Sequence, residues 1–453
     1  MLRISRHGPN IRQGLALLCL VAVLASCGQA PATQPNVLLI VIDTLRADHL
    51  GAYGYRHRDT SPAIDQFAKR ATRFTRAYAT AGWTRPSVGS ILTGLPPASH
   101  GANTIWNHLH PDVETLAESF KAAGYSTAGV VSNRHLLKKI GFAQGFDLWD
   151  ESQAQGAEHI SSHQINGLAL SMLDELDSAE RPWFLFVHYF DPHYQYLDHE
   201  SFDFAPPGAP LFDGSEAMKE LEDSVPSWSP GDREFLIGRY DEEIRLTDQA
   251  IGELLQQIES RPTSPDTLIA ITADHGEEFG EHGSVGHINL HDEVIRVPLL
   301  IQQPDGDGIC DVGETVSLLS LAPRLLELAG IAYPKERYPA PSLTGCHPQV
   351  PGRGQAFSES QKQRAVIDGD YKLIVDRERD TPRIYNLKAD PAETRNVAPT
   401  KPAVRRHLMQ LLARNQQQTV RRQSAAPEVG ERQLRFLQEL GYIEEEPAAE
   451  ASR

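Results

Sequence analysis

Residues 36–48 read NVLLIVIDTLRAD. Within them, 37–42 form an unbroken apolar run, which Asp43 follows. Comparable apolar or β-branched runs recur at 128–132, 183–189, 268–272 and 299–301. Helical periodicity appears at 113–123, 241–258 and 318–328. Short runs without polar interruption are typical of strands that are covered on both faces. The sequence therefore predicts an α/β fold with a doubly wound, mostly parallel sheet flanked by helices.

Acidic and imidazole side chains lie at or just after the ends of three of these runs. Asp43 ends the first run, Asp191 and His193 follow 183–189, and Asp274 and His275 follow 268–272. In doubly wound sheets, functional sites gather beyond the carboxyl ends of the strands. We therefore expect these side chains to lie in one site.

A further stretch, Ala81–Gly94, reads AGWTRPSVGSILTG. Pro86 and Ser87, two and three residues after Thr84, indicate a helix start, whose amide hydrogens would face a bound anion. In an arbitrary protein, Thr84 in this position would be read as a helix cap.

Together these stretches resemble the sulfatase family of the alkaline-phosphatase superfamily. In that family the nucleophile loop has Cys or Ser, any residue, Pro, Ser and Arg, and then an apolar run to Thr-Gly; here Thr84 and Val88 replace the nucleophile and the Arg. Residues 268–283, LIAITADHGEEFGEHG, resemble the second metal-binding strand and loop. Residues 371–374 and 384–397 resemble the small C-terminal subdomain, so the resemblance implies an α+β subdomain there.

The change to threonine decides the expected chemistry. A sulfatase nucleophile is formylglycine, an aldehyde made by oxidising Cys or Ser, whereas oxidation of Thr84 would give only a ketone. We therefore expect no formylglycine. The resemblance implies instead that Thr84 acts as a metal-activated alkoxide on phosphate mono- or diesters, as in threonine-bearing relatives.

The resemblance also implies a divalent metal ion held by Asp43, Asp274, His275 and the Thr84 oxygen. The common sulfatase site has a second aspartate after the first, and Thr44 occupies that place here. Fewer carboxylates and an imidazole favour zinc or manganese over calcium. Asp-His-Gly by itself would more often be a surface turn.

His193 and His287 resemble family residues that hold the anionic group or protonate the leaving oxygen, which makes them candidate catalytic residues. Alternatively, they and Asp191 hold a second metal, although Asp191 is equally suited to shape the turn before His193. Three further residues match the family loosely or are ambiguous: His282, Asn133 and His135.

The net charge of the chain disfavours one class of partner, and the composition leaves the oligomeric state open. The chain has 453 residues and a formal net charge of −17, which disfavours nucleic acid and other polyanions as partners. The resemblance implies a small anionic ester as the substrate. Three alternatives to a phosphoester hydrolase stay open. The chain could be a sulfuric ester hydrolase without formylglycine, a transferase that passes a phosphoryl group from Thr84 to an alcohol, or a catalytically degenerate anion-binding member.

The N-terminus has the pattern of an export signal. Three arginines precede the apolar run 14–25, which is shorter than the roughly 18 residues that span a bilayer. The following LASC, 24–27, resembles the bacterial lipobox, which implies acylation of Cys27 and a periplasmic protein anchored to a membrane. The alternative is a plain cleavable signal or an uncleaved anchor. In an oxidising compartment Cys310 and Cys346 could pair, or they could be separate buried thiols.

The expected domain organisation follows from these features. It comprises a lipoprotein signal peptide at 1–27, a tether at 28–35, a catalytic domain at 36–350, the small subdomain at 351–412, and a polar tail at 413–453 with a short helix at 434–443. Within the catalytic domain, residues 206–232 are rich in Pro, Ser and acidic residues, which favours a substrate-selecting lid.

Overall fold

The computed structural model describes residues 34–154 and 162–422, apart from 198, 200, 208–210, 212–217, 263–265, 305, 307, 344, 347–353 and 380. The predicted signal peptide, Cys27, nearly all of the tether and the helix expected at 434–443 lie outside these residues. The predictions made for them therefore stay predictions. None of the helices in the described part is long and apolar enough to cross a membrane.

An eight-stranded sheet forms the centre of the fold, in the order β12-β2-β11-β7-β1-β6-β4-β5. Its strands are β1 (Asn36–Ile42), β2 (Thr72–Phe74), β4 (Ser126–Val130), β5 (Leu148–Asp150), β6 (Trp183–Tyr189), β7 (Thr267–Ala273), β11 (Leu299–Gln302) and β12 (Cys310–Val312). Strands β7, β1, β6, β4 and β5 are parallel, whereas β11 runs antiparallel to β7 and β2. The expected mostly parallel sheet is confirmed.

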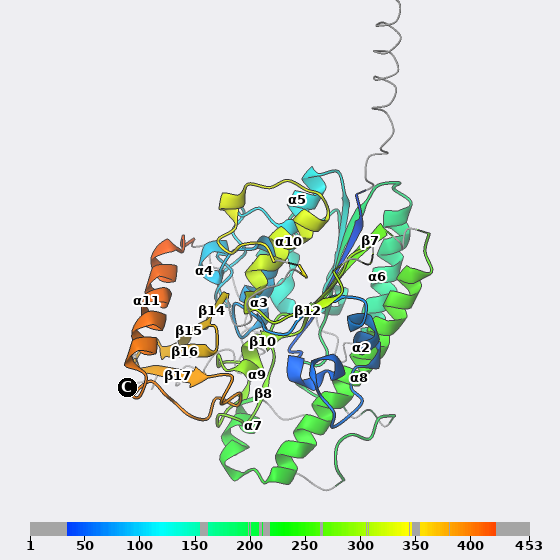
Figure 1. The fold of residues 1–453 in the computed structure, drawn as a ribbon. Coiled ribbons are helices and arrows are strands. Elements are labelled where there is room, and N and C mark those ends of the chain that lie inside the picture. The colour runs from blue at the N-terminus through cyan, green and yellow to red at the C-terminus, as the bar shows by residue number, and fades with distance from the viewer. Residues whose placement is uncertain are drawn as a thin grey trace, which may run out of the picture. The chain divides into compact units, whose positions relative to one another are not determined.

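Helices cover both faces of this sheet, which is why every residue of β1, β6 and β7 is buried. Figure 1 shows α2 (Pro62–Ala68), α6 (Ser162–Asp177) and α8 (Pro230–Glu259) on one side, and α3 (Thr84–Thr93), α5 (Leu116–Ala122) and α10 (Leu321–Leu328) on the other. The doubly wound arrangement is therefore confirmed.

Smaller elements surround this core. They are β3 (Ala77–Tyr78), β8 (Glu278–Phe279), β9 (Val285–Gly286), β10 (Arg296–Val297), β13 (Val316–Ser317), α4 (Pro97–His100), α7 (Met218–Ser224) and α9 (Asp292–Ile295). Cys310 of the edge strand β12 forms a disulfide with Cys346, so the first of the two alternatives for these cysteines holds.

Helix α8 begins at Pro230, well before the expected start at Asp241. Ser229 and Asp232 form a capping box in which each side chain binds the other's backbone N–H, and Pro230 fits the first helical position. The helix therefore takes up the end of the segment expected to be a lid. Helix α7 of that segment contacts β9, directly before His287. The lid role stays a prediction.

The C-terminal subdomain is an antiparallel sheet of β14 (Gln355–Glu359), β15 (Gln363–Asp368), β16 (Tyr371–Asp376) and β17 (Pro382–Asn386), with α11 (Pro402–Gln418) packed on β15 and β16. The expected α+β subdomain is present, but α11 extends past the predicted boundary at residue 412. The buried Lys372 ties the subdomain to the core, because its Nζ lies 2.6 Å from Asp292 Oδ1 in α9 and 2.7 Å from Glu393 Oε2.

Candidate active site

Two aspartates meet where neighbouring parallel strands end. Asp43 follows β1 and Asp274 follows β7, and the last residues of these strands, Ile42 and Ala273, are paired in register. The backbone N–H of Asp43 donates to the Tyr189 carbonyl at the end of β6 (2.9 Å). Both aspartates are fully buried. The sheet thus places two carboxylates side by side and out of water.

Asp43, Asp274 and His275 form a group suited to a metal ion, since each offers a ligand atom within 4.8 Å of the others. His275 Nε2 lies 3.5 Å from both Asp43 Oδ1 and Asp274 Oδ2. Its Nδ1 is 2.9 Å from the Gly276 carbonyl, which can only accept, so Nδ1 carries the hydrogen and the Nε2 lone pair faces the carboxylates. His275 Nε2 and Asp274 Oδ2 are buried without a hydrogen-bond partner.

The electrostatics of this group favour a bound cation. Burial, together with the Asp274 charge, raises the pKa of Asp43, and burial raises the pKa of Asp274 to about 8. Burial also lowers the pKa of His275, so its imidazole is neutral. The two carboxylates and the imidazole lone pair are all acceptors, so they cannot form hydrogen bonds with one another. A divalent ion can bind all three. The residues present therefore fit the expected metal, whose identity stays a prediction.

The Thr84 hydroxyl faces the same group. Thr84 is the first residue of α3, Trp83 is the N-cap, and no side chain caps the helix. Thr84 Oγ1 lies 3.5 Å from each carboxylate oxygen of Asp43. Asn133 Nδ2 donates to Thr84 Oγ1 (3.3 Å) and to Asp43 Oδ2 (2.7 Å). The hydroxyl is therefore directed at a metal-ligand candidate and does not stabilise the helix end.

The expected helix start at Thr84 is confirmed, but the residues after it have a different role from the one expected. Pro86 has no N–H, and the Ser87 N–H donates to the Trp83 carbonyl (3.4 Å). The Ser87 hydroxyl donates to the Asp274 carbonyl at 2.5 Å. These two residues therefore hold α3 against the end of β7 and do not present amides to an anion.

A glycine brings the loop before Thr84 next to His287. A Cβ at Gly82 would lie 2.8 Å from the His287 carbonyl oxygen and 3.0 Å from that of Asn289. Only glycine permits this approach. The nucleophile loop and the loop that carries His287 therefore pack backbone against backbone.

His193 and His287 both lie beside the site. Their ring centroids are 5.2 Å apart, and the His287 ring lies 4.6 Å from that of His275. His287 Nδ1 is 3.2 Å from Glu277 Oε1, whose other oxygen accepts from the Tyr196 hydroxyl. The structure therefore brings both predicted histidines to the group of Asp43, Asp274 and His275.

The tautomer of His193 is fixed by its backbone partner. Nδ1 donates to the Tyr194 carbonyl (2.5 Å), and burial lowers the pKa of His193 to about 4. At neutral pH Nε2 therefore carries a lone pair and accepts hydrogen bonds. The expected roles of gripping an oxyanion or protonating the leaving oxygen would need Nε2 to donate, so the role of His193 stays a prediction.

Asp191 is turned away from these histidines. Its Oδ2 accepts from the Ser162 backbone N–H (3.2 Å) and hydroxyl (2.7 Å) at the start of α6. Within the described ranges, the groups of three ligand atoms that meet within 4.8 Å include neither Asp191, His193 nor His287. These contacts do not support a second metal at the three residues. The Asp191 side chain holds the start of α6, whereas the role expected for it was in the turn before His193.

Sequence reasoning missed two residues of this site and undervalued a third. His188 of β6 places Nε2 3.8 Å from Asp43 Oδ2, and Glu277 contacts His287. Asn133, matched only loosely, bridges Asp43 and Thr84. The signal for His188 was a polar residue inside an otherwise apolar strand.

The remaining candidates have mainly positioning contacts. His135 Nδ1 lies 3.3 Å from Arg85 Nη2, and the same guanidinium donates to three backbone carbonyls. Thr44 has a positive φ of 52° and donates its N–H to Asp274 Oδ1 (3.3 Å). Val88 is buried in the hydrophobic core. His282 belongs to a separate cluster with Glu278 and His291.

Comparisons with known proteins identify relatives over most of the chain. The Sulfatase family model matches residues 35–331. A Delta 4,5-hexuronate-2-O-sulfatase of Bacteroides thetaiotaomicron is 25% identical over 429 residues, which cover 83% of this chain and 87% of the relative. The iduronate 2-sulfatase of Homo sapiens is 28% identical over 419 residues, covering 73% and 75%.

Solved structures with the same fold include a 2-O GAG sulfatase, with a TM-score of 0.70, 21% identity and coverage of 85% of this chain and 92% of the other. The phosphonate monoester hydrolase of Agrobacterium radiobacter gives a TM-score of 0.69 at 22% identity, covering 85% and 96%. The architecture described above is thus shared with both.

Proposed function

Because the chain belongs to the sulfatase family of ester hydrolases, we propose that it is a metal-dependent hydrolase that cleaves phosphate mono- or diesters with Thr84 as the nucleophile. The observation that carries this proposal is the position of the Thr84 hydroxyl. It lies 3.5 Å from both oxygens of Asp43 and accepts from Asn133, although a helix-capping role would direct it to the backbone of α3.

The residue roles follow from these contacts. A divalent ion held by Asp43, Asp274 and His275 would supply positive charge that makes the Thr84 hydroxyl more acidic and offsets the charge of the ester. Asn133 orients the Thr84 oxygen by donating to it, and the Thr84 hydroxyl hydrogen is directed toward Asp43. As Oγ1 attacks phosphorus, its proton passes to Asp43 and the bond to the leaving oxygen breaks, which gives a threonine phosphoester. Water then hydrolyses this ester, releases phosphate and restores the Thr84 hydroxyl and the Asp43 carboxylate.

The proton for the leaving oxygen is assigned to His287. Glu277 accepts from Nδ1–H of His287, which leaves Nε2 to carry the transferred proton. His193, neutral with Nε2 as an acceptor, is suited to receive a hydrogen bond from the attacking water or from a hydroxyl of the substrate.

Phosphate is favoured over sulfate because of two residues. Thr84 cannot become an aldehyde, and the buried Val88 supplies no charge where the family motif has arginine. Sulfuric ester cleavage by an unmodified threonine and phosphoryl transfer to an alcohol are the alternatives.

The test is a panel of aryl phosphate monoesters, diesters, phosphonates and sulfates, supplied with zinc or manganese, beside a mass measurement of the peptide that contains Thr84. We expect turnover of a phosphate ester and an unmodified threonine. An aryl sulfate as the best substrate, an oxidised Thr84, or no turnover by protein with its metal bound would overturn the proposal. Release of a phosphorylated alcohol when ethanol or glycerol is added would reassign the chain as a transferase.

A further inference from the structure

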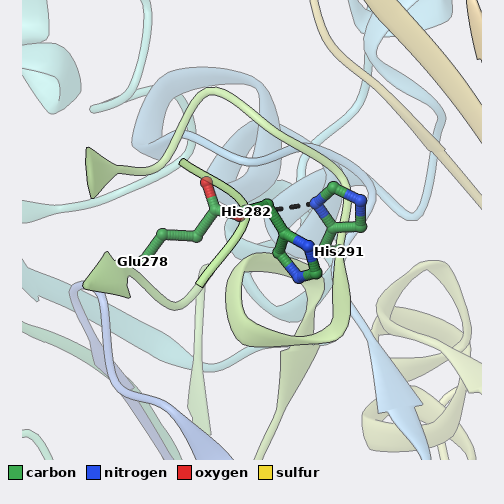
Figure 2. Close-up of side chains that lie close together, drawn as sticks. All are labelled: Glu278, His282 and His291. Carbon is green, nitrogen blue, oxygen red and sulfur yellow. Dashed lines mark ion pairs between the residues drawn. The ribbon is translucent and has the colours of Figure 1, made fainter. Parts of the chain in front are cut away.

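A second group of potential metal ligands lies outside the active site. Glu278 belongs to β8, His282 lies in the turn between β8 and β9, and His291 is the N-cap of α9. Each offers a ligand atom within 4.8 Å of the others. Figure 2 shows the two imidazole rings side by side, with the Glu278 carboxylate directed toward His291.

Three polar atoms of this cluster lack hydrogen-bond partners. Glu278 and His291 are each only 1% exposed, yet Glu278 Oε1 and both ring nitrogens of His291 make no hydrogen bond. The other Glu278 oxygen accepts from Asn289 Nδ2 at 2.6 Å. Buried polar groups are almost always paired, so three unpartnered atoms at one point indicate a missing ligand.

Proton sharing between the two side chains does not remove this cost. Glu278 Oε1 and His291 Nδ1 are 3.4 Å apart, longer than a hydrogen bond to an imidazolium. The only nearby buried ammonium, among the described residues, is Lys372, and it is occupied by Asp292 and Glu393.

The surroundings of His282 complete the arrangement. Its Nε2 lies 3.2 Å from Glu293 Oε2, and its ring stacks on that of His291 with centroids 3.6 Å apart. A carboxylate beside a metal-binding histidine fixes the orientation of the imidazole and raises its basicity. Glu293 is placed for this role.

We infer that Glu278, His282 and His291 bind a zinc ion at a structural site separate from the active site. Two imidazoles and one carboxylate form a ligand set that zinc prefers, whereas calcium requires six or more oxygen ligands. The ion would tie the β8–β9 hairpin to the start of α9. His287 and Glu277 both flank this hairpin, so the ion would fix the loop that carries them.

The test uses full-length protein in which two of the three proposed active-site ligands are replaced, by Asp274→Asn and His275→Asn. After treatment with a chelator and dialysis, this double variant is titrated with zinc, and bound metal is measured by elemental analysis. We expect about one zinc per chain, a higher thermal midpoint with zinc than without, and a cobalt spectrum typical of a four-coordinate site.

Adding His291→Gln to the double variant should abolish zinc binding and the zinc-dependent rise of the midpoint. His407→Gln is the matched control, because His407 is exposed and paired with Asp368, and it should retain both. Absence of zinc binding by the double variant, or unchanged binding after His291→Gln, would refute the second site. Since two of the three proposed active-site ligands are replaced throughout, neither result depends on the proposed hydrolase activity.

Discussion

At the scale of single residues, the protonation states of the histidines decide what each can do. A backbone carbonyl fixes the Nδ1 hydrogen of both His193 and His275, so their Nε2 atoms present lone pairs. His287 instead faces a carboxylate, Glu277, which accepts from its Nδ1–H. We therefore assign His275 as a metal ligand, His193 as a hydrogen-bond acceptor and His287 as a proton donor.

The protonation state of His193 determines how its replacement should affect kcat/KM at different pH. Burial lowers the pKa of His193 to about 4, so this imidazole loses its proton as pH rises through about 4 and stays neutral above it. His193→Asn should therefore lower kcat/KM by a similar factor at every pH between about 5 and 8. An inflection within this range in the wild-type profile that disappears in His193→Asn would contradict the assigned state.

The site residues that could be predicted are those that follow strands. Asp43, Asp274 and His275 each come directly after a buried parallel strand, so strand order alone brings them to one edge. Asn133 and Glu277 come from loops whose paths depend on packing. Their contacts with Thr84 and His287 could not be derived from local sequence.

At the scale of elements, apolar runs located the central strands because burial on both faces leaves an uninterrupted apolar signal. Strand β6 has the bounds that were expected, 183–189. The direction of β11 was not predictable, because a run buried on both faces has the same composition in a parallel and an antiparallel strand. The early start of α8 was missed because its first turns are polar apart from Phe235 to Ile237.

The edge strand β12 is linked by a disulfide to Cys346. Cys310 and Cys346 close a loop with a sequence separation of 36, so replacing both with serine should lower the free energy of unfolding by about 2–4 kcal/mol. Urea unfolding of the double variant and of wild type measures the difference. Wild type with a reducing agent serves as the control and should match the variant. Equal midpoints for oxidised wild type and the variant would show that the bond does not stabilise β12.

At the scale of the whole molecule, the disulfide agrees with an exported protein, since such bonds persist mainly in oxidising compartments. The arginines and apolar run of the N-terminus predict the same destination. We propose that the mature protein begins at Cys27 and is held at a membrane by lipid on that residue.

Fractionation of cells that express Cys27→Ala tests this anchor. The wild-type chain should be in the membrane fraction and resist extraction with salt, whereas the variant should move to the soluble periplasmic fraction. Cys19→Ala, within the apolar run, is the matched control and should remain with the membrane. Membrane association of Cys27→Ala after cleavage of the signal would contradict lipid anchoring.

The central claim is that the Thr84 hydroxyl performs the chemical step, and it is tested most directly by the turnover of purified Thr84→Ala on the best phosphate ester. The hydroxyl does not cap α3, so its removal should leave the unfolding midpoint and the metal content close to those of wild type. Turnover should fall by about 10⁴-fold or more, as expected for loss of a nucleophile. Near-normal turnover by folded, metal-containing Thr84→Ala would contradict the account.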